Sequence, residues 1–296
     1  MPTQLPQNLT LGCVFPRDDA RDAVIIHPSL LSSHQTLASL PKGSVIGTSS
    51  LRRSAQLKRL YPHLSFADAR GNVGTRLAKL DAPDSQYSAL ILAAAGLHRL
   101  GLSSRITQYL SKSNGGILHA VGQGAIGIEI RDADVEAKKL LAKVGCEWTT
   151  RAALAERSLM RTLEGGCSVP IGVETEWIPK QRSLGSNAGS GVGVGIKPAA
   201  EYHKLSGLAA SASEAAEQGD AEKEETRSEE LLLRAIVVSL DGKEAVEAEM
   251  TRRITSREEA DEFGWDVAKR LVDGGAGKIL EAITLNRGII EKQGDA

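Results

Sequence analysis

The sequence is poor in aromatic residues, in cysteine and in net charge. Phe, Trp and Tyr make up 3% of the 296 residues, which argues against the stacking surfaces that bind single-stranded nucleic acid. Lys and Arg total 36 against 37 for Asp and Glu, a net charge of −1, so no global field attracts DNA or an anionic membrane. The three cysteines are widely spaced (Cys13, Cys146 and Cys167). They fit neither a disulfide framework nor a paired thiolate zinc site, and they favour a reducing compartment.

Long apolar runs and metal-ligand patterns are missing from the sequence as well. No apolar run approaches the ~18 residues of a membrane span, and the polar, Pro-containing start after Met1 does not resemble a signal peptide. The six histidines show no metal-ligand spacing. We therefore expect a globular cytoplasmic protein of about two domains, without a metal, a nucleic-acid partner or a membrane partner.

The first half of the chain alternates between strand-like and helical patterns. A strand is expected over 10–15 and a turn over 16–19, with Asp18, Asp19 and Asp22 in that turn region. Apolar periodicity then predicts helices over 30–40, 50–61, 72–80 and 94–100, and strands over 44–47, 64–67 and 88–93. This order predicts a parallel sheet covered on both faces.

The second half reads as an antiparallel α+β domain. A helix is expected over 149–163, capped by Thr149 or Thr150, and a closing helix over 258–271. Strands are expected over 168–177, 231–240 and 245–254, the last two joined at Asp241-Gly242, which is a strong hairpin signal. Residues 178–230 are rich in Ser, Gly, Ala and Glu and predict a flexible insertion.

Basic residues gather around the segment Gly47-Thr48-Ser49-Ser50-Leu51-Arg52-Arg53. A short strand, a glycine, three hydroxyls and a helix start are typical of an anion site, because free N–H groups and Arg side chains bind carboxylate or phosphate. Between Thr48 and Arg76 one acid, Asp68, faces six basic residues: Arg52, Arg53, Lys58, Arg59, Arg70 and Arg76. The sheet pattern predicts that strand ends deliver these arginines to one crevice. A solvated helix face with capping hydroxyls is the alternative.

Two further loops are candidates for chemistry. Val121-Gly122-Gln123-Gly124-Ala125 places glycines on both sides of a Gln, which suits either a close backbone approach or a tight crossover between domains. Cys167 follows Gly165-Gly166 at an expected helix end. By its chemistry alone Cys167 is either a buried inert thiol or a nucleophile and attachment point.

Five motifs in order resemble the porphobilinogen deaminase (hydroxymethylbilane synthase) family. They are GTSSLRR (47–53), ARGNVGTRL (69–77), AAAGLHRLG (93–101), VGQGAIGIE (121–129) and EGGCSVPIG (164–172), and PRDDARDA (16–23) also fits. The resemblance implies a transferase of haem-type tetrapyrrole (porphyrin) biosynthesis that condenses four porphobilinogen molecules, with loss of ammonia, into linear hydroxymethylbilane. It also implies a dipyrromethane cofactor attached through Cys167.

The resemblance assigns further roles residue by residue. Each pyrrole carries an acetate and a propionate, which Arg side chains pair with. The implied cofactor- and substrate-binding residues are Thr48, Ser49, Ser50, Arg52, Arg53, Arg70, Gly71, Arg76, Arg99 and Ala125, and Arg17 is a weaker candidate. The expected partners are porphobilinogen and its oligomers, bound by a monomer.

The resemblance also predicts the fold and a departure from the family. The expected fold is α/β: a mixed or parallel sheet domain like type II periplasmic binding proteins (21–121), an incomplete first domain (1–20 and 122–143), and a smaller α+β cofactor-bearing domain (147–296) containing the 178–230 insertion. The family's catalytic Asp lies in a Lys-Asp pair that would precede Met1. The sequence therefore predicts a truncated chain that is inactive as given. Because the true N-terminus is expected to be missing, a location in an organelle stays open beside the cytoplasmic one. The alternatives are a non-catalytic remnant that binds pyrrole carboxylates or other small anions, and a periplasmic-type anion-binding module.

Overall fold

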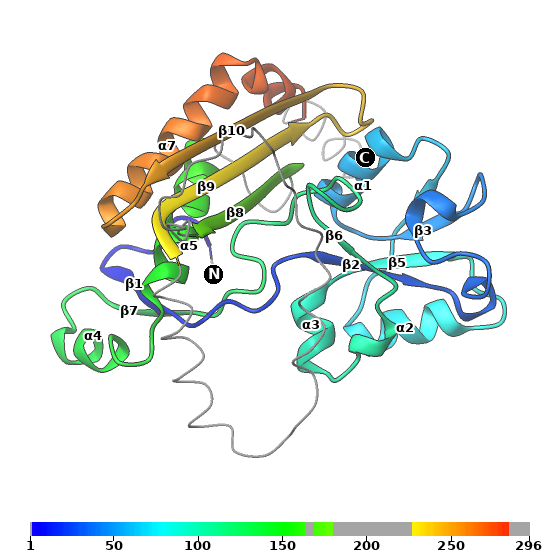
Figure 1. Cartoon of the computed structure of the whole chain (residues 1–296), viewed down its shortest axis with the longest axis horizontal. Helices are drawn as coiled ribbons and strands as arrows, with labels where there is room; N and C mark the ends of the chain where they lie inside the picture. Colours follow the sequence, from blue (N-terminus) through cyan, green and yellow to red (C-terminus); the bar gives the residue numbers. More distant parts are fainter. Residues whose placement is uncertain (1, 164–168, 180–226, 284–296) are drawn as a thin grey trace, which may run out of the picture. The chain divides into compact units, whose positions relative to one another are not determined.

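A computed structural model describes residues 2–163, 169–179 and 227–283. Of these residues, 2–163, 169–176 and 231–283 belong to one compact unit, and 177–179 and 227–230 belong to a second. The predicted division into three domains is not tested by this partition and stays a prediction. The described strands form three sheets, which Figure 1 shows as ribbons.

The largest sheet has five strands in the order β4-β3-β5-β2-β6. These are β2 (Asp22–Ile26), β3 (Val45–Gly47), β4 (Ser65–Ala67), β5 (Ala89–Ala93) and β6 (Gln108–Leu110). β3 runs parallel to β4 and β5, with Ile46 beside Phe66, whereas β2 runs antiparallel to β5 and β6. The sheet is therefore mixed, which is one of the two forms that the resemblance predicts: β2 lies between β5 and β6 and runs opposite to both.

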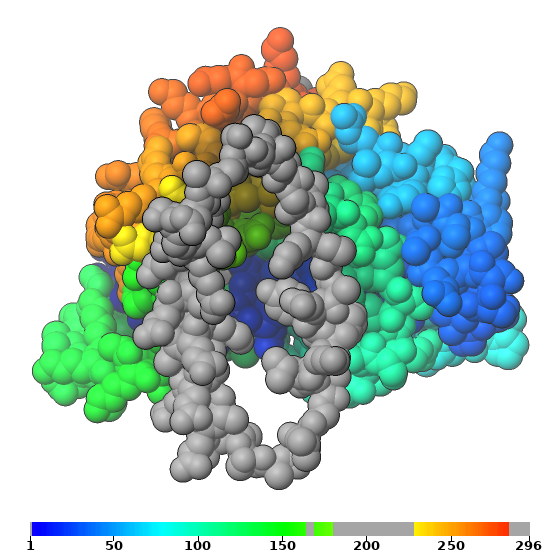
Figure 2. Space-filling view, viewed as in Figure 1, coloured from blue at the N-terminus to red at the C-terminus, as the bar shows by residue number. Residues whose placement is uncertain are grey.

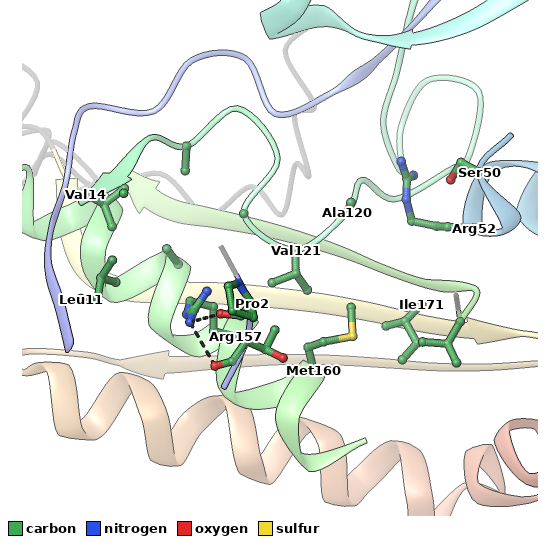
Figure 3. Close-up of a pocket in the computed structure, with 16 residues that line it drawn as sticks. Pro2, Leu11, Val14, Ser50, Arg52, Ala120, Val121, Arg157, Met160 and Ile171 are labelled. Carbon is green, nitrogen blue, oxygen red and sulfur yellow. Dashed lines mark hydrogen bonds between the residues drawn. The ribbon is translucent and has the colours of Figure 1, made fainter. Parts of the chain in front are cut away.

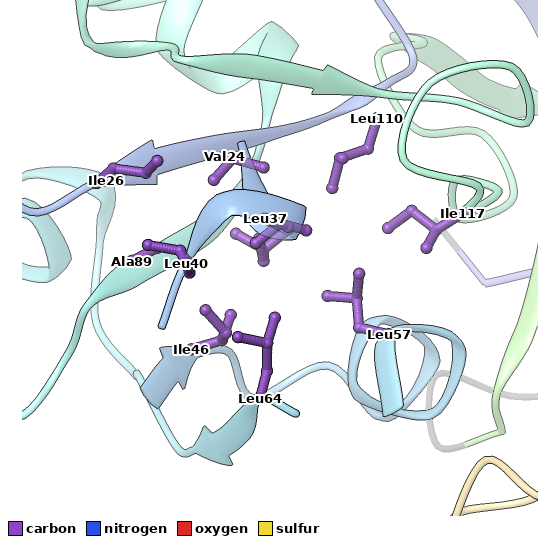
Figure 4. Close-up of a cluster of buried hydrophobic side chains, with 11 residues drawn as sticks. Val24, Ile26, Leu37, Leu40, Ile46, Leu57, Leu64, Ala89, Leu110 and Ile117 are labelled. Atoms are coloured by element: carbon purple, nitrogen blue, oxygen red, sulfur yellow. The ribbon is translucent and has the colours of Figure 1, made fainter. Parts of the chain in front are cut away.

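Both faces of this sheet are buried, as the order of the elements predicts. Val24 and Ile26 of β2 point into one apolar cluster and Ala23 and Ile25 into another, because successive side chains of a strand alternate between faces. Figure 4 shows the first cluster, which contains Val24 and Ile26 of β2, Leu57 and other residues from flanking segments. The covering helices are α1 (Leu51–Leu60), α2 (Val73–Asp81) and α3 (Ala94–Arg99).

One predicted helix is absent. Over 30–40 the chain forms two short 3₁₀ turns, η1 (Pro28–Leu30) and η2 (Leu37–Ser39). The side chain of Thr36 accepts from the backbone N–H of Ser39, and the Ser39 hydroxyl bonds back to Thr36. Such local side-chain bonds to the backbone compete with a continuous helix. A third turn, η3 (Ser103–Arg105), precedes β6.

A two-stranded sheet brings distant parts of the chain together. β1 (Leu9–Val14) pairs antiparallel with β7 (Gly127–Arg131), and α4 (Val135–Leu141) follows. In the space-filling view the green α4 segment stands out at the edge of the first unit (Figure 2). Val135 and Leu140 of this segment are 58% and 64% exposed.

The third sheet has the order β10-β9-β8 and packs against two long helices. Its strands are β8 (Ile171–Pro179), β9 (Arg227–Val238) and β10 (Ala245–Arg253), and the helices are α5 (Glu147–Thr162) and α7 (Arg257–Asp273). The predicted hairpin is confirmed. The backbone N–H of Ser239 donates to the carbonyl of Glu244, and the N–H of Gly242, which has φ +78°, donates to the carbonyl of Ser239.

Two expectations in this half need correction. The N-cap of α5 is Cys146, with no side-chain cap, because the Thr150 hydroxyl instead donates to the Cys146 carbonyl and accepts from the N–H of Val14. The range 178–230 is not wholly irregular either, since β8 runs to Pro179 and β9 begins at Arg227. Residues 180–226 of the expected insertion lie outside the described part of the chain.

Candidate functional site

The loop between β3 and α1 forms the helix start that the sequence predicts. The Ser50 hydroxyl accepts from the N–H of Arg53 at 3.4 Å, and the Thr48 hydroxyl accepts from the N–H of Ser50 at 3.2 Å. These bonds fix the entry of the chain into α1. Thr48 and Ser49 line a shallow surface hollow with Asp68, whereas Ser50 lines a separate, more enclosed cavity.

Arg52 and Arg53 of α1 share one buried carboxylate, that of Asp22. Arg52 Nη1 lies 2.7 Å from Asp22 Oδ2, and Arg53 Nη2 lies 2.7 Å from Asp22 Oδ1. Asp22 is fully buried in β2, so its expected place in a turn is wrong. Burial by itself raises the pKa of this carboxyl, but the two guanidinium groups outweigh burial and hold the pKa well below its usual range. Two cations against one anion leave a surplus of one positive charge.

Gln123 ties this cluster to the Gly-rich loop. Its Nε2 donates to Asp22 Oδ1 at 3.0 Å and to the Ala20 carbonyl at 2.7 Å, and its Oε1 lies 3.4 Å from Arg52 Nη2. A Cβ on Gly124, which has φ +79°, would lie 2.6 Å from the Asp18 carbonyl oxygen. Close backbone approach therefore explains this glycine.

A second buried ion pair holds the same loop from the side of α5. Glu156 is fully buried and accepts from Arg17 Nη1 at 2.6 Å, from the Thr175 hydroxyl at 2.6 Å and from the N–H of Gly122 at 2.8 Å. Burial raises the pKa of Glu156, but Arg17, with smaller contributions from His119 and Thr175, outweighs burial and lowers the pKa to about 2. Arg17, a weaker candidate for substrate binding, is therefore neutralised within the protein.

A cavity of about 470 Å³ opens beside these two ion pairs. Ser50, Arg52 and Ala125 line it, together with Arg157 of α5 and a mainly apolar wall that includes Val121 and Met160. Figure 3 shows the guanidinium groups of Arg52 and Arg157 approaching it from α1 and α5. Val169 also lines the cavity. Cys167, the expected attachment point, precedes Val169 by two residues and lies outside the described residues.

The other predicted site residues lie elsewhere. Arg70 is exposed and bonds to Asp68 at 2.8 Å, and Arg76 donates to the Gly71 carbonyl at 2.7 Å. Arg99 is half-exposed, bonds to Asp18 at 2.7 Å and donates to the Gly124 carbonyl. Among the described residues, the cavity lining includes none of Arg53, Arg70, Gly71, Arg76 and Arg99. The structure thus places one of the predicted arginines, Arg52, on the cavity.

Sequence reasoning missed four polar residues of the site: Asp22, Gln123, Glu156 and Arg157. Asp22 and Gln123 fall inside motifs quoted for the family, but no local pattern marks them as partners of Arg52. Within the described ranges, no helix is long and apolar enough to cross a membrane, and no cluster of His, Cys, Asp and Glu could hold a metal ion.

Comparison with known proteins gives a consistent result. Residues 1–139 match the family model for the dipyromethane cofactor binding domain of porphobilinogen deaminase, and residues 150–185 match its C-terminal domain. The chain is 46% identical over 285 residues to a protein of Yarrowia lipolytica named porphobilinogen deaminase, covering 96% of this chain and 69% of that protein. Proteins of the same name from Saccharomyces cerevisiae and Synechococcus sp. are 42% and 41% identical, with 97% and 96% of this chain and 72% and 71% of each relative covered.

Proposed function

Because the chain belongs to the porphobilinogen deaminase family, we propose that it is a hydroxymethylbilane synthase. In this transferase reaction, four porphobilinogen molecules are joined head to tail, and ammonia is lost at each step. The resemblance in the sequence is confirmed by the family match and by relatives at 40–46% identity. The comparisons do not bear out the expectations that the chain is truncated and inactive.

One observation supports this function above the others. The surplus positive charge of the Asp22–Arg52–Arg53 cluster reaches a largely apolar cavity through Arg52. Pyrrole rings offer an apolar body and acidic side groups, and a guanidinium group forms strong charge-assisted bonds to a carboxylate. The cavity therefore matches a pyrrole carboxylate in both polarity and charge.

The dipyrromethane cofactor fits the residues of this cavity. Ser50 places a hydroxyl and Arg52 a positive charge beside its carboxylates, and Val121 and Met160 offer apolar contacts to its rings. The proposed attachment point, Cys167, is two residues before Val169, which lines the cavity. Two residues span at most about 7 Å, so the chain keeps Cys167 within that distance of Val169. When bound, the cofactor supplies the anchored end to which porphobilinogen units are added.

The remaining expected contacts are also proposals. Thr48, Ser49, Arg53, Arg70, Gly71, Arg76, Arg99 and Ala125 would bind the cofactor or the growing chain. For Arg70 and Arg99 this requires exchange of their present partners, Asp68 and Asp18, for ligand carboxylates. Such exposed pairs contribute about 0–1 kcal/mol, so the exchange costs little.

The type II periplasmic-binding-protein likeness is also proposed, and the helix-covered mixed sheet supports it. A monomeric state, a cytoplasmic location and the absence of nucleic-acid and membrane partners stay predictions.

Intact mass spectrometry tests the cofactor assignment directly. The full chain is incubated with porphobilinogen, and its mass is compared with those of Cys167→Ser and of Cys146→Ser, a matched control in which a partly exposed thiol at the start of α5 is removed. We expect an adduct of dipyrromethane size in the unmodified chain and in Cys146→Ser, and none in Cys167→Ser. A mass equal to that of the bare polypeptide in all three would overturn the proposal.

A further inference from the structure

Residues 2–5 precede β1 and belong to no helix or strand. The chain after them is fixed by its own backbone: the N–H of Leu9 donates to the Pro6 carbonyl at 3.1 Å, and the N–H of Asp132 donates to the Asn8 carbonyl at 2.8 Å. No such backbone bond reaches residues 2–5 from the part of the chain that the structure describes. The position of this segment therefore depends on side chains of neighbouring elements.

Arg157 of α5 supplies the hydrogen bonds that the segment does receive. Its Nη2 donates to the Pro2 carbonyl at 2.7 Å and to the Thr3 carbonyl at 3.0 Å, and Figure 3 draws both bonds as dashed lines. The exposure of Arg157 is 9%, and bonds from a charged donor are stronger than neutral ones, above all where water is scarce. One guanidinium on a helix thus fixes two successive carbonyls of an otherwise loosely held backbone.

The segment held by Arg157 is part of the cavity wall. Pro2 and Thr3 line the cavity of about 470 Å³. Thr3 also lines a further hollow, together with Gln4 and Leu5, and Arg157 borders both spaces. The segment therefore separates the cavity from the hollow, and its release would join the two spaces and admit water to the cavity.

The acceptors of Arg157 distinguish it from the arginine one helical turn further along α5. Arg161 pairs with the carboxylate of Asp261, whereas the acceptors that the described residues offer to Arg157 are main-chain carbonyls. A carbonyl does not neutralise a cation. These bonds therefore serve to place the backbone and not to compensate a charge.

We propose that Arg157 is a positioning residue, which acts on ligand binding in the cavity through residues 2–5 and not by touching the ligand. The effect on the ligand rests on the proposed function, because it takes the ligand from that function, whereas the clamp on the segment does not. A closed wall excludes water, and a lower local dielectric strengthens the charge-assisted bonds that Arg52 makes to a ligand. Loss of the clamp should therefore weaken binding while Arg52 stays in place.

A thiol at residue 3 reports on the clamp without any ligand. Thr3 is half-buried, so Thr3→Cys in the full chain is alkylated with iodoacetamide, and peptide mapping separates this site from the three native cysteines. We expect Arg157→Met to speed alkylation at residue 3 about three- to tenfold, because two charge-assisted bonds are lost. Arg157→Lys keeps a charged donor without the planar fork and should lie in between. Arg151→Met is the matched control: its side chain stacks over the Trp148 ring at 5.3 Å, and its rate should equal that of the parent.

Adduct formation then tests whether Arg157 acts through the segment. The unmodified chain, Arg157→Met, a variant lacking residues 2–5 and the combination of both changes are incubated with increasing porphobilinogen, and the fraction carrying the dipyrromethane-sized adduct is read by intact mass. We expect each single change to raise the half-saturating concentration about tenfold. The combination should lie within about twofold of the deletion alone, because two changes that remove the same interaction are not additive.

Three results would overturn the inference. The first is an unchanged alkylation rate at residue 3 in an Arg157→Met variant that is folded by circular dichroism. The second is an equal effect of Arg157→Met in the full and the shortened chain, which would show that Arg157 touches the ligand itself. The third is a failure of both Arg157 variants to fold, which would give Arg157 a role in global stability. Should only the shortened chain fail to fold, the alkylation rates and the intermediate position of Arg157→Lys decide. A lack of adduct in the unmodified chain would overturn the proposed function and the effect on its ligand, and alkylation would still show whether the clamp exists.

Discussion

Replacement of Glu156 by Gln should lower the free energy of unfolding, because the buried carboxylate and its hydrogen bonds stabilise the fold. Glu156 is fully buried, and its carboxylate accepts four hydrogen bonds, two of them from Arg17. Its pKa is lowered from 4.5 to about 2, and one pKa unit corresponds to about 1.4 kcal/mol. The ionised form therefore stabilises the folded state by about 3 kcal/mol at neutral pH. Gln mimics the protonated form and loses this amount.

Urea unfolding followed by circular dichroism measures the loss. With a slope of about 3 kcal/mol per molar urea, the midpoint of Glu156→Gln should fall by about 1 M at neutral pH. Because the folded pKa is depressed, the contribution is present above the unfolded pKa and is lost as the pH falls through the folded pKa. The difference between the two proteins should therefore shrink to roughly half by about pH 3.

A surface substitution provides the matched control. Glu136 of α4 pairs with Lys139, and both side chains are largely exposed. Glu136→Gln should change the free energy of unfolding by less than about 0.5 kcal/mol. If Glu156→Gln changed stability as little as Glu136→Gln, or if the difference did not depend on pH, the stabilising role of the Arg17–Glu156 pair would be refuted.

Two further substitutions test the packing around α1. Asp22→Asn leaves two buried guanidinium groups without a counter-ion and should lower the free energy of unfolding in urea by about 3–5 kcal/mol. The control Asp68→Asn breaks an exposed pair and should lower it by less than about 1 kcal/mol. Equal urea midpoints for the two variants would contradict this. A Cβ on Gly242 would lie 2.8 Å from the backbone N of Arg59, so Gly242→Ala should lower the unfolding free energy at least about 1 kcal/mol more than Gly101→Ala. Gly101 is the control because its φ is also positive but no atom lies within 4 Å of its added Cβ. Equal losses of unfolding free energy in the two variants would show that the hairpin is not packed tightly against α1.

The local pattern of the sequence predicted most elements of the sheet domain. The helix over 50–61 and the strand over 44–47 are confirmed to within a residue or so, because apolar spacing and the Ser50 cap are local signals. The helix over 30–40 was wrong because Thr36 and Ser39 satisfy the backbone locally. The direction of β2 was also beyond a local pattern, since direction depends on which strand a segment pairs with.

Of the candidate site, the sequence predicted the residues that donate to an anion but not the acids that pair with its arginines. The motif GTSSLRR indicates donors for an anion at α1, and Arg52 and Ser50 do line the cavity. Its counter-ions were missed, because an acid in PRDDARDA gives no sign of whether it is solvated or buried against a helix 30 residues later. Glu156 of α5 was missed for the same reason, since Arg17 lies 139 residues away along the chain.

The sequence by itself determined the family, the inventory of arginines and the strands and helices that carry them, because motifs and periodicity are properties of neighbouring residues. Tertiary structure decided which of those cations are already neutralised. Glu156 pairs with Arg17, and Asp22 is shared by Arg52 and Arg53 so that one positive charge is left over, while the guanidinium of Arg157 has neutral carbonyls as its acceptors. Coulombic pairing acts over a few ångströms and burial strengthens it, so the charge that a cavity offers to a ligand depends on contacts that only the folded chain makes.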